Sequence, residues 1–182
     1  MNWVLERILV GRADRQTISK YAAGADRYLG VVLILAAALL GMALTSRALT
    51  ASGYMGLDGT YSLLDMLLPL FKGGNGKSAG FIVIIALLIP VLLLSNAFDL
   101  WYKLELQGEI FARKAVRLQQ YGKLWYLECV AIIFGIYILF SAKDEVILHP
   151  AIYYLVISVG LQKLVLTRLG SMINTVKFVE EE

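Results

Sequence analysis

The chain has 182 residues, of which 59% are hydrophobic and 17% charged, with a formal net charge of +3. This balance is far from that of an average soluble domain and predicts a single membrane domain. One cysteine, Cys129, and one histidine, His149, exclude an intrachain disulfide framework and argue against a zinc site built on these ligands. We therefore expect no metal and no other cofactor.

Residues 1–27 form an amphipathic N-terminal segment. Its apolar residues Trp3, Leu5 and Ile8 lie beside the charged residues Glu6 and Arg7. This pattern predicts a helix that either lies in the cytoplasmic interface of the membrane or packs on the cytoplasmic ends of a helix bundle. The sequence leaves both interpretations open.

Four stretches are apolar and long enough to cross a bilayer, which takes about 20 helical residues. They cover about 28–45, 81–101, 124–140 and 146–166. They predict an all-α membrane protein with a four-helix transmembrane domain over 28–169, followed by a tail over 170–182. The loop between the second and third stretches is rich in helix-forming residues and is expected to extend both spans beyond the bilayer.

The distribution of basic residues predicts the orientation of these spans. Lysines and arginines gather before the first span, between the second and third, and after the fourth, whereas the other two loops hold only Arg47, Lys72, Lys77 and Lys143. The positive-inside rule then places both termini and the middle loop in the cytoplasm. Because most basic residues flank spans, where they meet anionic headgroups, no nucleic-acid partner is expected.

The first extracytoplasmic loop, residues 46–80, is sizeable and ends in the glycine-rich run FKGGNGKSAG. This run resembles a nucleotide-binding P-loop, but the position of the first required glycine is occupied by Phe71, and a leucine-rich segment stands where a strand is needed. A flexible loop leading into a span is the better interpretation. The rest of the loop suits either a short strand pair or an amphipathic helix, and the sequence does not decide between them.

Small residues on the first span offer a face for close helix packing. Ala37 and Gly41, with Ala38 and Met42 alongside, predict that another helix approaches there.

Pro90 lies near the middle of the second span, where proline removes a backbone hydrogen bond and commonly kinks a helix. It indicates either a hinge or pocket wall, or a tolerated proline whose freed carbonyl is satisfied by local adjustment. The second interpretation is favoured.

Five polar residues in or near the spans are candidate site residues: Asn96, Asp99, Glu128, Lys163 and Arg168. A charge in hydrocarbon is costly, so each needs a partner or a task. The predicted topology brings the charged ones to one level, as a polar cluster for a lipid headgroup or a moving proton, or as an ion-pair belt that pins the helices together. The belt is favoured, and Glu128, the deepest, is the best functional candidate. His149 is expected in a water-exposed loop.

Four motifs, in this order, resemble the membrane module of the paraquat-inducible protein A family, inner-membrane proteins that accompany MCE-type lipid-transport tunnels. They are GLDGTYSLLDMLLPLF, IALLIPVLLLSNAF, YGKLWYLECVAIIF and HPAIYYLVISVGL. The chain departs from the family in lacking its zinc ribbon and the lysine after the proline span. It also carries Glu128 one place earlier, relative to Trp125, than the family's aspartate.

The resemblance implies a small protein of the bacterial inner membrane that takes part in lipid transport or handover. Its partners would be membrane lipids, other membrane-protein subunits and an MCE-type protein. Replacing Glu128 or Asn96 is then expected to reduce lipid traffic. The alternative is a structural or assembly subunit of a membrane complex without transport activity of its own. No nucleophile with a nearby base is evident, so we do not expect an enzyme.

Overall fold

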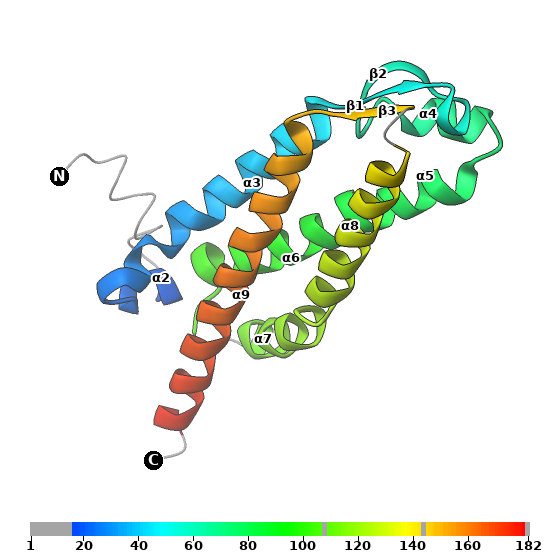
Figure 1. The fold of residues 1–182 in the computed structure, drawn as a ribbon. Helices are drawn as coiled ribbons and strands as arrows, with labels where there is room; N and C mark the ends of the chain where they lie inside the picture. Colours follow the sequence, from blue (N-terminus) through cyan, green and yellow to red (C-terminus); the bar gives the residue numbers. More distant parts are fainter. Residues whose placement is uncertain (1–15, 107–108, 143–144, 181–182) are drawn as a thin grey trace.

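The computed structural model describes residues 16–106, 109–142 and 145–180. The apolar run that begins at Trp3 lies outside these residues. Figure 1 shows the elements in chain order, which are α2 (Ile18–Tyr21), η1 (Gly24–Tyr28), α3 (Leu29–Thr45), β1 (Arg47–Ser52), η2 (Tyr54–Gly56), β2 (Asp58–Ser62), α4 (Leu67–Lys72), α5 (Gly76–Ile82), η3 (Val83–Leu88), α6 (Ile89–Phe98), η4 (Asp99–Lys103), α7 (Glu109–Tyr121), α8 (Leu124–Ser141), β3 (Val146–Leu148) and α9 (Ala151–Glu180).

Four helical runs are long and apolar enough to cross a membrane, as the sequence predicted. They are Gly24–Thr45, Gly76–Lys103, Glu109–Ser141 and Ala151–Thr175. The second run is 28 residues long, more than the roughly 20 that a perpendicular crossing needs, so it has length to cross with a tilt. In Figure 1 this run passes behind α9 from α5 to α6. The strands lie at one end of the bundle, the sheet side, and α2 and α7 at the other, the terminal side.

Helices α3 and α9 pack side by side along a continuous buried seam (Figure 1). On α3 the seam repeats every three or four residues, as coiled-coil packing requires, and consists of Leu29, Leu33, Ala36, Leu40 and Ala43. From α9, the hydroxyl of Ser158 donates a hydrogen bond of 2.8 Å to the carbonyl oxygen of Ala36.

The small-residue face predicted on α3 is not the face that the described part of the chain buries. Gly41, Ala38 and Met42 are exposed, and Ala37 is only half-buried. The leucines of α3 determine which of its faces is buried. On that face the two alanines, Ala36 and Ala43, let α9 approach closely, as small residues do.

The loop over residues 46–80 folds into both of its predicted alternatives, a strand pair and a helix. Strand β1 pairs antiparallel with β2 and with β3, in the order β2-β1-β3, and α4 follows. The described part of the chain is therefore mostly helical, as expected, with one small sheet in addition. The P-loop-like run joins helix α4 to helix α5, and Asn75 holds this turn by donating a 2.8 Å hydrogen bond to the carbonyl of Met55.

The sheet also corrects the start of the fourth span. That span was expected from Val146, but the β-prone residues of 146–148 form β3, and the helix begins after Pro150, which suits a helix start. His149 is half-buried rather than a water-exposed loop residue. Its Nε2 lies 2.8 Å from the Thr50 hydroxyl, which lies 2.8 Å from that of Thr60.

The loop between the second and third spans is helical, as predicted, but α7 does not continue directly into α8. Gly122 and Lys123 form a turn between them, where the amide of Gly122 donates to the carbonyl of Leu118 at 2.8 Å. A Cβ atom on Gly122 would lie 2.9 Å from that oxygen, so the turn requires glycine. At the other end of the chain, α9 runs past the predicted boundary at residue 169.

Helix α8 is the least covered of the four spans. In its run, 11% of the most apolar stretch is buried, against 39% in each of the other three. Its exposed apolar side chains share one face of the helix and include Tyr126, Val130, Ile133, Phe134 and Tyr137. This face of α8 is therefore not covered by the described rest of the chain.

Candidate functional site: an apolar cavity beneath the sheet

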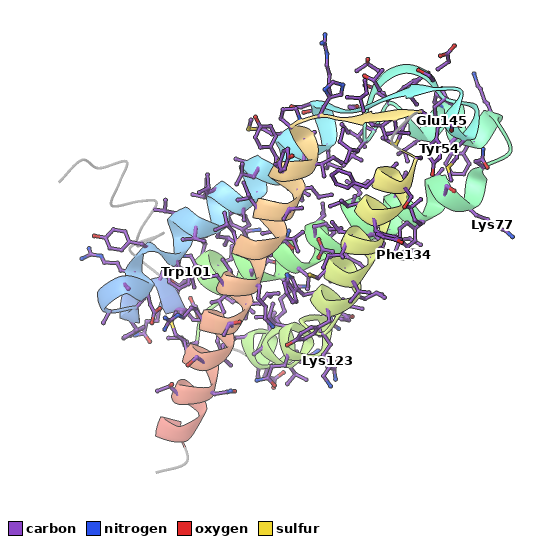
Figure 2. All side chains as sticks on the ribbon, in the orientation of Figure 1. Tyr54, Lys77, Trp101, Lys123, Phe134 and Glu145 are labelled. Atoms are coloured by element: carbon purple, nitrogen blue, oxygen red, sulfur yellow. The ribbon has the colours of Figure 1, made fainter. Side chains whose placement is uncertain are left out.

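A cavity of about 150 Å³ lies on the sheet side of the bundle. Its walls come from β1 and the segment that follows it up to α4, from α5 and η3, from α8 and from the start of α9. They include Leu49, Tyr54, Leu57, Met66, Phe81, Ile85, Ala86, Ala131, Gly135, Ile136, Ile152 and Leu155. Among the described lining residues, only Tyr54 and Ser78 have a hydroxyl group, and none is charged. Figure 2 shows Tyr54 close beneath the sheet.

Pro90 explains part of this wall. Because proline cannot donate a backbone hydrogen bond to the preceding turn, that turn has to adjust. The turn before Pro90, η3, is a wider π-helix, a form that is rare and frequent at functional sites. Two of its residues, Ile85 and Ala86, line the cavity. Local adjustment therefore accommodates Pro90, which does not itself line the cavity, while two residues of the adjusted turn do.

Helix α8 forms the opposite wall, where a glycine leaves space that a larger side chain would fill. Gly135 lines the cavity, and a Cβ atom placed on it would meet nothing within 4 Å. Any larger residue at this position would extend into open space. The cavity therefore exists partly because α8 carries glycine where it faces η3.

The size and lining of the cavity determine what it can hold. The cavity is partly open, and its volume is about that of a cavity that accepts benzene. With no charged group among the described lining residues, it compensates little of the desolvation of a charged or strongly polar solute. What fits is a hydrocarbon segment, such as part of a lipid acyl chain.

Glu128 lies next to this cavity along α8. It is one turn before Ala131 and Ile132, which both line the cavity. Its side chain is fully buried, and among the described residues neither carboxyl oxygen has a hydrogen-bond partner. The Trp101 Nε1 and the Gln162 Oε1 are likewise buried and unpartnered in that part of the chain, but only Glu128 can carry a charge.

The other predicted charges separate into pairs instead of forming one cluster. Asp99 contacts Lys103 at 2.9 Å and also Lys114 of α7. Arg168 lies 3.9 Å from Asp26 of η1. These pairs fit the predicted ion-pair belt on the terminal side, but they do not include Glu128.

The two remaining candidates have other partners. Lys163 donates a 3.1 Å hydrogen bond to the Tyr126 hydroxyl and lies 4.8 Å from the ring centre of Trp125. The Asn96 side chain donates to the carbonyl of Leu92 in its own helix at 3.0 Å. Asn96 is therefore engaged locally, and it is not among the cavity residues.

Sequence reasoning missed the cavity and two partners. Lys114 and Asp26 lie outside the predicted spans, and no spacing rule links them to Asp99 or Arg168. Gly135, a glycine within an apolar span, was a usable signal for the cavity, because such positions permit close approach or leave space.

Comparison with family models, curated proteins and solved structures gives no match. The resemblance to the paraquat-inducible protein A family therefore rests on the sequence motifs alone.

Proposed function

We propose that this protein binds the acyl chain of a membrane lipid in the cavity beneath the sheet and takes part in lipid transport or handover. The observation that carries the proposal is a cavity of about 150 Å³, with no charge among its described lining residues, at the sheet side of a protein with four candidate spans. A hydrocarbon tail is the ligand that such a lining favours. This function requires no covalent chemistry, and we propose none.

The proposed setting is the bacterial inner membrane, with the termini in the cytoplasm and the sheet on the outer face. The sheet side carries few basic residues in sequence, which supports this orientation. There the sheet would meet a periplasmic partner, and the resemblance favours an MCE-type protein. Lipid would then pass between the cavity and that partner.

The test fills the cavity from α8. Gly135→Leu adds a side chain to open space in the cavity wall, whereas Gly160→Leu adds the same side chain to an exposed position of α9, where a Cβ atom also meets nothing within 4 Å. We expect Gly135→Leu to displace lipid and Gly160→Leu to have no effect, while both variants stay folded.

The measurement uses phosphatidylglycerol with a photoactivatable diazirine near the end of one acyl chain. Crosslinks in the original protein should map to cavity residues such as Ile85 and Ile136, and Gly135→Leu should reduce them severalfold. Crosslinking that is confined to the exposed side chains of α8, such as Phe134, and unchanged in Gly135→Leu would refute the proposal.

The exposed surface of α8 favours a second candidate function, a structural or assembly subunit of a membrane complex. Its run is the least buried of the four. Under this alternative, purification in mild detergent yields stoichiometric partner chains, and Gly135→Leu leaves lipid traffic unchanged.

A further inference from the structure

A second cleft, of about 200 Å³, lies on the terminal side of the bundle, between the α7–α8 turn and α9. Unlike the cavity beneath the sheet, it is lined by polar and basic groups. They are Gln119, Lys123, Tyr126, Lys163 and Thr167, and Leu118, Gly122, Leu166 and Gly170 complete the lining. None of these described lining residues is acidic.

Hydrogen bonds fix the two walls of this cleft relative to each other. The Gln119 side chain of α7 donates to the Oδ1 of Asn174 on α9 at 3.0 Å. Lys163 of α9 donates to the Tyr126 hydroxyl of α8 at 3.1 Å. The cleft is therefore held by α9 on one side and by the α7–α8 turn on the other.

The two lysines differ in how they are held. The Lys163 ammonium group lies 4.8 Å from the ring centre of Trp125 and 4.4 Å from that of Tyr126, so the rings hold it in place. Lys123 is exposed at the turn, and Figure 2 shows it at the terminal end of α8. One cation is thus fixed at the wall of the cleft, and the other can close over a ligand.

We propose that this cleft binds a phosphate group, and that a phospholipid headgroup is its source. Two ammonium groups and nearby hydroxyls are suitable donors to phosphate oxygens. Tryptophan and tyrosine beside lysine mark the level of the membrane interface, where headgroup phosphates lie. Leu118 and Leu166 in the same lining suit the start of the apolar tails. This site does not depend on the acyl-chain cavity and lies at the opposite end of the bundle.

The experiment measures binding of phosphatidylglycerol and of phosphatidylcholine to the full chain in detergent, by native mass spectrometry. Each lysine near an anionic surface contributes about fivefold in affinity, so Lys123→Ala with Lys163→Ala should weaken phosphatidylglycerol binding by about 25-fold. The matched control, Lys72→Ala with Lys77→Ala, removes the same charge from exposed residues of the sheet side and should change binding less than twofold.

A steric variant tests the same cleft without altering its charge. A Cβ atom on Gly170 would meet nothing within 4 Å, so Gly170→Leu should fill the cleft and also weaken phosphatidylglycerol binding. Thermal unfolding of each variant shows that it remains folded. If inorganic phosphate at millimolar concentration displaces phosphatidylglycerol, the cleft recognises the phosphate group itself, and if it does not, recognition needs the whole lipid. Unchanged binding in both the double variant and Gly170→Leu, or an equal loss in the Lys72 and Lys77 control, would overturn the proposal.

Discussion

The α3–α9 pair and helix α8 are packed in opposite ways. The pair has a closed seam of leucine and alanine that a hydrogen bond from Ser158 also links. Helix α8 buries little of its surface, and the side that does face the chain borders the apolar cavity. The close packing of α3 and α9 therefore supports the bundle, whereas the cavity beside α8 leaves room for a ligand.

The first prediction tests this comparison by introducing a leucine into each region. Ala36 is fully buried in the seam, so Ala36→Leu forces α3 and α9 apart, and we expect it to lower the free energy of unfolding by about 3 kcal/mol. Gly135→Leu enters open space and should not destabilise the fold. Unfolding in mixed micelles with increasing SDS measures both.

Ala38→Leu is the control for Ala36→Leu, because Ala38 lies on the exposed side of the same helix. It should unfold like the original protein. If Ala36→Leu proves as stable as Ala38→Leu, the seam is not closely packed and the contrast with α8 fails.

The second prediction concerns Glu128, which is fully buried but has no hydrogen-bond partner among the described residues. An unsatisfied buried polar group costs about 1–3 kcal/mol, so Glu128→Met should raise the free energy of unfolding by about 2 kcal/mol. The same variant should lose lipid traffic if the carboxyl serves the neighbouring cavity. A fall in stability would instead reveal a partner for the carboxyl that the described residues do not supply.

The spans were predictable because their physical cause is local. Twenty apolar residues cannot be solvated by water, so composition alone finds them. The buried face of α3 was not predicted correctly. Gly41 suggested close packing on its own side of the helix, but the spacing of Leu33, Ala36 and Leu40 determines which face packs against α9.

The site was less predictable because it depends on contacts between distant segments. The cavity depends on open space at Gly135 and on the widened turn before Pro90, and although both residues are visible in the sequence, nothing in the sequence shows that they face each other. The sequence predicts a span from Val146 because Val146–Leu148 is as apolar as the helix that follows. Only the pairing of these residues with β1 distinguishes strand β3 from that helix.

The third prediction sharpens the contrast between paired and unpaired carboxyls. Asp99 is mostly buried and contacts two lysines, so Asp99→Asn should destabilise the protein by about 1 kcal/mol, the opposite sign to Glu128→Met. Glu109→Gln breaks an exposed pair with Arg113 and should have no measurable effect. Unfolding in SDS mixed micelles compares the three variants, and equal effects of Asp99→Asn and Glu109→Gln would contradict the prediction.

The smallest expected effect is in the sheet that covers the cavity. The Thr50 hydroxyl connects Thr60 of β2 to His149, so it links the loop over residues 46–80 to the start of α9. Thr50→Val keeps the shape and the strand preference but removes both hydrogen bonds, and we expect a loss of about 0.5 kcal/mol. Hydrogen exchange of residues 47–62 should become faster, while Thr45→Val, which removes only a bond within α3, should leave it unchanged. Because the sheet forms part of the cavity wall, faster exchange with unaltered acyl-chain crosslinking would show that the helices alone define the lipid site.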